Sequence, residues 1–311
     1  MIVSKGTDIP ETEGLVATIG FFDGVHLGHR FLIDELKRVA EAKGLPSAVI
    51  TFSAHPRTVL QPDFHPNLLN TLDEKLTQLE TTGLDYCIVM DFSEELSQLS
   101  AQAFITQILK EQLNVKTLLI GYDHRFGHDR TDGFEQYVAY GAACGMNVMK
   151  ASPYEAEDVT VSSSAIRDKL LNGEVEAATK LLSYPYSLTG HIVDGYKVGR
   201  KLGFPTANIV VNNPDKIIPA IGVYAVWVYV EGEKHKGMLY IGDRPTLQNG
   251  THITMEVNIL NFDRNIYNNQ ITVAFINYVR GDYKFNSLEE LKDQLAADRD
   301  VVDKRLDKTA K

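Results

Sequence analysis

The chain has 311 residues, a length that predicts two domains, each large enough to bury its own core. Hydrophobic residues make up 44% of it and charged residues 23%, which is typical of a globular protein and excludes a wholly disordered or fibrous chain. The net charge of −10 argues against a general binder of nucleic acid or of an anionic membrane.

Cysteine usage and the N-terminal segment bear on the compartment. Cys87 and Cys144 are too few for a disulfide framework and lack metal-ligand spacing, so we expect both to be small core residues. The N-terminal segment lacks the apolar region of a signal peptide, and no stretch approaches the roughly 20 apolar residues that span a bilayer. These features predict a cytoplasmic protein.

Short apolar runs alternate with helical patterns through the first half of the chain. Strands are predicted at residues 15–20, 47–52, 86–90, 116–121 and 146–150. Helices are predicted at residues 28–43, from residue 71, and at 100–112, 133–143, 163–171 and 174–182. This alternation predicts an α/β domain with a doubly wound parallel sheet, followed by a helical linker that ends at Tyr184-Pro185.

From residue 186 the helical period disappears and strand-like runs recur. They lie at residues 187–193, 224–230, 238–241, 254–261 and 271–280, with residues 231–237 expected to form a hairpin connection. Strands in series predict an antiparallel β-barrel, and Ser287-Leu-Glu-Glu290 resembles a capping box that opens a terminal amphipathic helix to about Leu306.

The charge balance also changes between the two halves. Residues 1–185 contain 15 Lys and Arg against 26 Asp and Glu, whereas residues 186–311 contain 16 against 15. Together with the change of pattern, this step predicts one domain over residues 1–184 and a second over residues 185–311.

The turn after the first predicted strand reads Gly20-Phe-Phe-Asp-Gly-Val-His26-Leu-Gly-His29 and leads directly into a helix. In an open parallel sheet, ligands bind beyond the carboxyl ends of the strands, and a helix N-terminus attracts anions. His26 and His29, with Gly24 and Gly28 allowing close backbone approach, therefore predict a phosphate site in which the imidazoles stabilise developing charge. Alternatively, one histidine caps the helix and the other is solvated.

A second pattern lies early in the barrel region. The segment Gly195-Tyr-Lys-Val-Gly-Arg-Lys-Leu-Gly-Phe-Pro-Thr-Ala-Asn208 interleaves three glycines with three cations, which favours contact with a polyphosphate. It is neither a P-loop nor a dinucleotide fingerprint, and a surface turn is the alternative. Further along, Glu256 stands in a β-type run, where alternation alone predicts an outward-facing carboxylate.

These motifs and several others resemble those of the bacterial bifunctional riboflavin kinase/FAD synthetase family. The resemblance covers about residues 14–300, and the motifs follow one another along the chain in the same order as in the family. The turn at 20–29 is similar to the His-x-Gly-His signature of nucleotidylyltransferases, and three further segments of the first domain match: Thr51-Phe-Ser-Ala-His-Pro56, Gly121-Tyr-Asp-His-Arg-Phe-Gly127 and Val161-Ser-Ser-Ser-Ala-Ile-Arg167. In the second domain the matches are Pro205-Thr-Ala-Asn208, Gly222-Val-Tyr224, Ile241-Gly-Asp-Arg-Pro-Thr246, Met255-Glu-Val-Asn-Ile-Leu-Asn-Phe262 and Val279-Arg-Gly-Asp-Tyr-Lys-Phe285.

The resemblance implies an enzyme with two activities. The C-terminal module would transfer the γ-phosphate of ATP to riboflavin, which gives FMN and ADP. The N-terminal module would then join FMN to the adenylyl group of a second ATP, which gives FAD and pyrophosphate. Mg²⁺ is implied as the cofactor of both steps. The implied partners are the small molecules riboflavin, FMN and ATP, without nucleic acid or membrane.

The resemblance also implies roles for individual residues. His26 and His29 stabilise charge on the transferred phosphates, and Glu256 accepts the proton of the riboflavin 5′-hydroxyl. The residues implied to hold ATP in the first module are Gly20, Phe21, Asp23, Gly24, His26, Gly28, His29, Asp123, Ser163, Ser164 and Arg167. Those implied to hold ATP or flavin in the second are Gly195, Lys197, Gly199, Lys201, Gly203, Pro205, Thr206, Asn208 and Arg280, with Thr206 and Asn208 as oxygen ligands of Mg²⁺. For Arg167 and Arg280, the alternative is a surface cation.

The chain departs from the family pattern at several positions. Phe21 replaces the usual Asn, Ala54 replaces Pro, Ser164 replaces Thr, Ser183-Tyr184 replaces Gly-Arg, and Asn258 and Asn261 replace His and Asp. Two other functions therefore stay open. One is a riboflavin kinase whose adenylyltransferase is weakened by Phe21, and the other is a non-catalytic flavin or nucleotide sensor. A retained Glu256 argues against the sensor, which needs no base.

Overall fold

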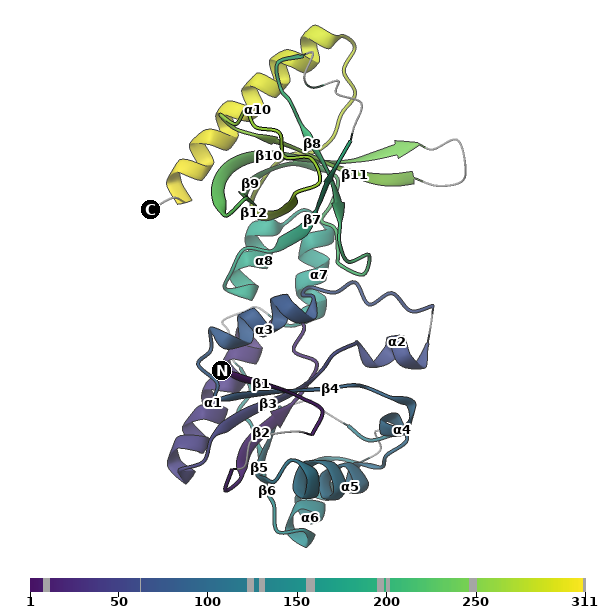
Figure 1. Ribbon diagram of the computed structural model, residues 1–311, viewed down its shortest axis with the longest axis vertical. Coiled ribbons are helices and arrows are strands. Elements are labelled where there is room, and N and C mark those ends of the chain that lie inside the picture. The colour runs from purple at the N-terminus through teal and green to yellow at the C-terminus, as the bar shows by residue number, and fades with distance from the viewer. Residues whose placement is uncertain are drawn as a thin grey trace. The chain divides into compact units, whose positions relative to one another are not determined.

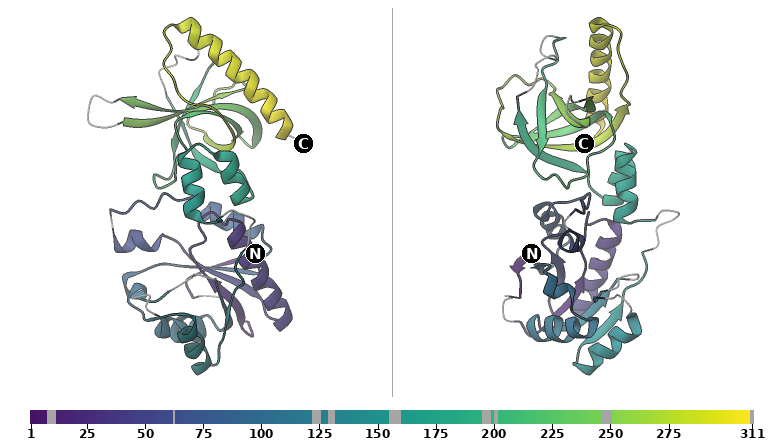
Figure 2. Two further views of the ribbon diagram at one scale, coloured as in Figure 1. Left: turned by 180° about the vertical axis from the view of Figure 1, so that it is seen from behind. Right: turned by 90° about the vertical axis from the view of Figure 1, so that its right-hand side faces the viewer.

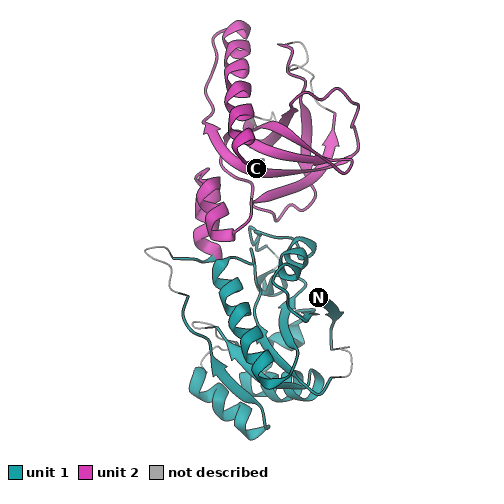
Figure 3. Cartoon of the chain, turned by 90° about the vertical axis from the view of Figure 1, so that its left-hand side faces the viewer, with its two compact units in different colours: residues 1–162 teal, residues 163–311 magenta. Residues whose placement is uncertain are grey.

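The computed structural model describes residues 1–7, 12–61, 63–121, 126–128, 132–154, 160–194, 199, 202–245 and 251–309. The chain divides into two compact units, residues 1–162 and 163–311 (Figure 3). The first is an α/β unit and the second contains a closed barrel, as the sequence predicts. The division falls 22 residues before the predicted boundary at 184, so helices α7 and α8 belong to the unit of the barrel.

A six-stranded parallel sheet forms the centre of the first unit (Figure 1). Its strands are β1 (Ile2–Lys5), β2 (Leu15–Ile19), β3 (Ser47–Phe52), β4 (Tyr86–Met90), β5 (Val115–Ile120) and β6 (Asn147–Lys150), in the order β1-β4-β3-β2-β5-β6. The five predicted strands are confirmed. The sequence does not predict β1, because this edge strand has four residues and only one of them is buried.

The helices of this unit are α1 (Leu27–Lys43), α2 (Pro56–Leu60), α3 (Leu72–Glu80), α4 (Glu94–Ser97), α5 (Ala101–Ala103), the π-helix η1 (Phe104–Gln112) and α6 (Phe134–Ala143). The predicted capping box is confirmed, since Thr71 Oγ1 accepts from the Glu74 N–H and Glu74 Oε2 accepts from the Thr71 N–H. The predicted helix at 100–112 changes from α to π geometry after three residues. α2 and α4 are too short to show a period.

The sheet separates two hydrophobic cores because alternate residues of each strand face opposite sides. In β2, Leu15 and Ala17 join the core formed with η1 and α6, whereas Val16 joins the core formed with α1 and α3. The chain leaves β2 toward β3 on one side, and β5 pairs on the other. The carboxyl end of β2 is therefore a topological switch point, where open α/β sheets bind ligands.

Six antiparallel strands close the barrel of the second unit in the order β10-β11-β8-β7-β12-β9. They are β7 (Ser187–Val193), β8 (Ala207–Val211), β9 (Gly222–Val230), β10 (Glu233–Pro245), β11 (Thr251–Ile259) and β12 (Gln270–Arg280). The sequence does not predict β8, which overlaps the Pro205–Asn208 motif. The predicted connection over residues 231–237 is wrong, because only Glu231 and Gly232 form the turn. Both have positive φ, 53° and 80°, which is typical of a two-residue type I′ hairpin.

In the described part of this unit, α8 (Val175–Leu182) and α10 (Leu288–Thr309) pack on the barrel, and α7 (Ser163–Leu171) packs against α8. α8 is tied to β12, since Asn277 Nδ2 donates to Glu176 Oε1 at 2.9 Å. α10 runs along the outside of the barrel (Figure 2), where Val302 and Leu306 bury the ring of Trp227. No helix in the described parts of the chain is both long and apolar enough to cross a membrane.

A buried ion pair fixes α10 to the end of β12. The Arg280 guanidinium donates to both oxygens of Asp298, from Nε at 2.9 and 3.1 Å and from Nη2 at 2.7 Å. Asp298 is 2% exposed and also accepts from Gln294 Nε2 at 2.8 Å. This pairing satisfies a carboxylate that burial would otherwise destabilise.

We predict that Asp298→Asn lowers the free energy of unfolding of the barrel unit by about 3–5 kcal/mol, because it leaves the Arg280 cation without its counter-charge. Trp227, the single tryptophan, reports on this unit in a urea titration followed by fluorescence. Asp303→Asn is the matched control on the same helix. Its ion pair with Lys236 is exposed, so we expect a loss below about 1 kcal/mol. Equal effects of the two variants would contradict the prediction.

Candidate functional site

The turn after β2 has an unusual backbone. Phe22, Gly24 and Val25 all have positive φ, at 56°, 84° and 37°. Phe22 and Val25 are buried, and left-handed φ costs roughly 1 kcal/mol or more for residues with a Cβ. Contacts with surrounding residues must therefore maintain the conformation of this turn, which leads directly into α1.

Both predicted histidines lie where this turn meets α1. His26 is the N-cap, and its Nδ1 accepts the backbone N–H of His29 at 3.3 Å. The two rings stack with centroids 3.7 Å apart, and the Phe22 ring lies 5.0 Å from that of His29. Because Nδ1 of His26 is an acceptor, its proton is on Nε2, which is a donor. The His26 imidazole thus caps the helix, which is one part of the alternative interpretation. It also lies beside the His29 ring at the positive N-terminal end of α1.

Glycines lie close to the aromatic rings of this turn. A Cβ at Gly28 would lie 3.3 Å from the His26 ring and 3.7 Å from the Val161 carbonyl oxygen. A Cβ at Gly20 would lie 3.0 Å from the Phe22 ring. A side chain at either position would therefore displace these rings slightly, whereas the positive φ of Gly24 favours glycine directly. The close backbone approach of Gly24 and Gly28 to a phosphate stays a prediction.

Asp23 holds a neighbouring segment. Its buried carboxylate accepts the backbone N–H groups of Leu69 and Asn70, each at 3.0 Å. These residues directly precede Thr71, which caps α3. The structure therefore gives Asp23 a positioning contact, in addition to the ATP contact predicted from the resemblance.

Lys75 of α3 is a residue of this site that the sequence analysis did not find. It is 3% exposed, and its Nζ donates to the Phe21 carbonyl, Thr51 Oγ1 and the Phe52 carbonyl at 3.1, 3.0 and 2.9 Å. Burial lowers the pKa of Lys75 to about 8. The sequence does contain a sign of this buried lysine. Residue 75 follows Leu72 by three positions and precedes Leu79 by four, a spacing that places a cation in the apolar stripe of a helix.

Other predicted residues of the first module are less fully described. Asp123 lies outside the described residues. Ser163, Ser164 and Arg167 lie in the first turn and a half of α7, which the contact division assigns to the second unit. Their roles in ATP binding stay predictions.

In the barrel, strand register aligns several predicted residues in one row. Residues that pair directly across antiparallel strands share a face. Asn208 of β8 pairs with Glu256 of β11, which pairs with Tyr240 of β10. Tyr240 in turn pairs with Val223 of β9, and Val223 with Arg280 of β12. We call these five residues the outer row, since Val223 belongs to the core beneath α10 on the outside of the barrel.

Glu256 is held beside the Pro205–Asn208 motif. Thr206 Oγ1 donates to Glu256 Oε2 at 3.2 Å. Buried Asn258, two residues along β11, donates from Nδ2 to the Pro205 carbonyl at 2.7 Å. Asn258 thus supports the motif in a chain that departs from the family at this position. Asn261, the second such departure, has a φ of 55°, which suits asparagine.

Tyr240 lies in the outer row between Glu256 and Arg280 and was not predicted. Burial is the main cause that raises the pKa of Tyr240 to about 12. The negative charge of Asp282, which accepts a hydrogen bond from the Tyr240 hydroxyl, adds to this effect. Its ring also lies over Gly242, where a Cβ would be 2.4 Å from it. A neutral phenol therefore stands next to the predicted base.

The glycine-rich segment before the motif is only partly described. Gly195, Lys197 and Lys201 lie outside the described residues. Gly199 accepts the Phe204 N–H at 2.9 Å, and a Cβ there would lie 2.3 Å from the Phe204 carbonyl, so only glycine fits. Gly203 has a φ of 86°. The close approach at Gly199 and the positive φ at Gly203 both favour glycine, as is typical of a tight loop.

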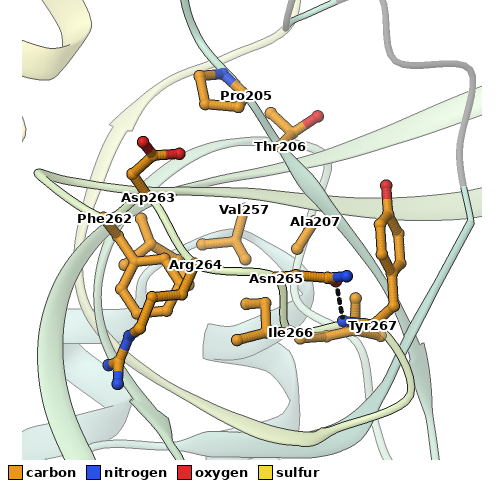
Figure 4. A pocket seen from close by; sticks show the side chains of 12 residues that line it. Pro205, Thr206, Ala207, Val257, Phe262, Asp263, Arg264, Asn265, Ile266 and Tyr267 are labelled. Atoms are coloured by element: carbon orange, nitrogen blue, oxygen red, sulfur yellow. Dashed lines mark hydrogen bonds between the residues drawn. The ribbon is translucent and has the colours of Figure 1, made fainter.

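A pocket of about 360 Å³ opens beside Thr206 (Figure 4). Its lining is formed by Ile192, Pro205, Thr206, Ala207, Val257, Ile259, Phe262, Asp263, Arg264, Asn265, Ile266 and Tyr267. Apolar side chains share this lining with the polar side chains of Thr206, Asp263, Arg264, Asn265 and Tyr267, and the Arg264 guanidinium points away from the centre of the pocket (Figure 4). This size and lining suit a small molecule with one flat apolar part. Among the described residues, no cluster of three or more His, Cys, Asp or Glu could hold a metal ion.

Comparison with known families gives two matches along the chain. A model of FAD synthetase matches residues 8–165, and a model of riboflavin kinase matches residues 182–306. The first match includes the turn before α1, and the second includes the outer row and the pocket.

Whole-length relatives agree with these matches. The bifunctional riboflavin kinase/FMN adenylyltransferase of Listeria monocytogenes is 39% identical over 284 residues, which are 91% of this chain and 90% of that protein. The protein of the same name from Escherichia coli is 37% identical and covers 92% and 91%. A crystal structure named macrolide-efflux protein from Streptococcus pneumoniae has a TM-score of 0.86 and 32% identity, and covers 97% of this chain and 98% of that one.

We predict that Asp23→Ala raises the amide hydrogen exchange rates of Leu69 and Asn70 by about tenfold or more, because both N–H groups lose a charged acceptor inside the protein. Exchange measured by NMR tests this, with the amide of Ile88 in the centre of the sheet as the reference. Unchanged protection at Leu69 and Asn70 would mean that Asp23 does not hold this segment.

Proposed function

This chain belongs to the family of bifunctional riboflavin kinases/FMN adenylyltransferases, and we propose that its two activities reside in separate modules, residues 1–184 and 185–311. The enzyme phosphorylates riboflavin to FMN and adenylylates FMN to FAD. The matched ranges support a boundary between residues 165 and 182, near the predicted one.

Glu256 is the general base of the kinase in this proposal. The observation that carries it is the 3.2 Å hydrogen bond that Thr206, a residue of the pocket lining, donates to Glu256. The carboxylate accepts the proton of the riboflavin 5′-hydroxyl as that oxygen bonds to the γ-phosphorus of ATP, and the bond from phosphorus to the β-phosphate oxygen breaks to release ADP.

The pocket beside Thr206 receives the adenosine of this ATP. The apolar part of its lining suits a purine, and Thr206 of this lining is hydrogen-bonded to Glu256. The phosphates would then extend from the pocket toward the base, past the glycine-rich segment that precedes Pro205.

The oxygen donors of this site suit Mg²⁺. A threonine hydroxyl, an asparagine amide oxygen and a nearby carboxylate are hard ligands, which Mg²⁺ prefers to nitrogen or sulfur. Thr206 and Asn208 would hold the ion together with the ATP phosphates. When bound, Mg²⁺ neutralises charge on the transferred phosphate.

The turn before α1 carries the adenylyl transfer. An FMN phosphate oxygen attacks the α-phosphorus of ATP, and pyrophosphate leaves. His26 Nε2, the His29 ring and the N-terminus of α1 stabilise the negative charge on the phosphates without a nucleophile from the protein. Local donors are needed, because residues 1–185 carry a net charge of −11 and their overall field repels ATP.

We predict that Glu256→Gln lowers the kcat of FMN formation by about 100-fold or more, since the amide cannot accept the proton. Adenylylation of supplied FMN should stay unchanged. Chromatography of products from riboflavin and Mg-ATP, and separately from FMN and Mg-ATP, measures both. Glu289→Gln, which changes an exposed carboxylate of α10 in the same unit, is the matched control and should retain kinase activity. Normal FMN formation by Glu256→Gln would overturn the assignment.

For the other module, we predict that His29→Ala lowers the kcat of FAD formation from FMN by about 100-fold and leaves FMN formation intact. His128→Ala, in the same unit, should change neither reaction. If wild-type protein makes FMN but no FAD, the chain is a riboflavin kinase with a weakened transferase. If it makes neither product, it is a sensor.

A further inference from the structure

We infer that Lys75 is a positioning residue of the adenylyltransferase, because its buried ammonium fixes the backbone of the turn that presents His26 and His29. This inference rests on the proposed role of that turn in adenylyl transfer. The sequence motifs do not include Lys75, and its hydrogen bonds go to the Phe21 and Phe52 carbonyls and the Thr51 hydroxyl rather than to either histidine.

The contacts of Lys75 join three elements. Its three N–H groups match three acceptors, which are the carbonyl of Phe21 in the turn, the carbonyl of Phe52 at the end of β3 and the hydroxyl of Thr51. Thr51 Oγ1 in turn donates to the Phe21 carbonyl at 3.1 Å. α3 therefore holds the carboxyl end of β3 and the first residue of the strained turn at a fixed separation.

The ring of Phe21 adds a fourth contact. Lys75 Nζ lies 4.3 Å from its centroid, within the range of a cation–π interaction. The edge of the ring meets His55, with centroids 4.8 Å apart. The phenylalanine that replaces the family's asparagine thus has a defined role, since it pairs with the buried cation.

A reciprocal contact runs from the turn back to α3. Asp23 accepts from the N–H groups of Leu69 and Asn70, next to the cap of α3, while Lys75 reaches from α3 to Phe21. Each side thereby contributes one buried charge. Movement of α3 would shift residues on both flanks of Phe22, and through them the start of α1.

The proposal predicts a defined kinetic effect. Lys75→Met keeps the length of the side chain but removes the ammonium donor of the Phe52 carbonyl and leaves the Phe21 carbonyl only the Thr51 hydroxyl. We expect kcat for FAD formation to fall by about 100-fold, the size of effect that a shift of about 1 Å in catalytic groups produces, with KM for ATP changed less than threefold. FMN formation by the same chain serves as an internal control.

Thr71→Ala is the matched structural control. It removes the cap of the same helix without touching the turn, so we expect it to lower stability while kcat for FAD formation stays within twofold of wild type. Equal losses of kcat in Thr71→Ala and Lys75→Met would overturn the proposal, because any loosening of α3 would then suffice.

A measurement without substrate separates this inference from the proposed function. In protein labelled with ¹⁵N-histidine, the Nδ1 signal of His26 reports its hydrogen bond to the His29 N–H. We expect Lys75→Met to shift this signal and Thr71→Ala to leave it in place. A shift would support positioning by Lys75 even if His29→Ala retained FAD formation. An unmoved signal in Lys75→Met would contradict it.

The pH profile gives a second test, which also applies if Lys75→Met fails to fold. Burial lowers the Lys75 pKa to about 8, and a negative charge on Cys87 of β4 or Asp23 of the turn opposes this. Because burial also raises the pKa of Cys87 to about 11, its thiol is neutral at pH 8, which leaves Asp23 as the opposing group. Above pH 8 the amine keeps two donors for three acceptors, so kcat for FAD formation should fall by about threefold or more between pH 7 and pH 9. Lys75→Arg stays charged over this range. Identical profiles for wild type and Lys75→Arg would contradict the inference.

Discussion

The strained turn after β2 depends on two buried charges of opposite sign. Phe22 and Val25 hold left-handed φ angles that are unfavourable for residues with a Cβ, and no helix or strand geometry maintains them. The Asp23 carboxylate of the turn binds backbone N–H groups in the segment before α3, and the Lys75 ammonium of α3 binds the Phe21 carbonyl of the turn. Because both charges are removed from water, their hydrogen bonds are strong and their loss is costly. The positions of the stacked histidines His26 and His29 depend on these contacts.

In the second unit, the side chains of the candidate site are positioned by strand pairing. One register across five strands brings the base, its neighbouring phenol and the Arg280 cation into the outer row. Side chains on a pleated sheet need no special backbone conformation, and the Arg280–Asp298 pair couples the end of the row to the terminal helix. The chain thus combines a site built on a strained turn with a site built on paired strands, in which the register of β12 shifts before Asn277 and again before Arg280.

The sequence predicts the contiguous parts of both sites. His26 and His29 share a turn and a helix start, and the Pro205–Asn208 motif is a single segment, so local pattern and family resemblance are sufficient for them. Contacts between distant residues cannot be obtained in this way. Lys75 meets Phe21 across 54 positions, and Tyr240 reaches Glu256 only once the barrel register is known. The short β1 and the two-residue turn after β9 were missed because neither carries a period.

The turn at Glu231-Gly232 has an evolutionary consequence. It sets the pairing of β9 with β10 and hence the face on which Tyr240 stands, eight residues after Gly232. A shift of this pairing by one residue would move every later side chain of β10 to the opposite face. Lineages of this enzyme can therefore vary the two turn residues within the limits of positive φ, whereas an inserted residue has to be accommodated by a longer loop if Tyr240 is to stay beside Glu256.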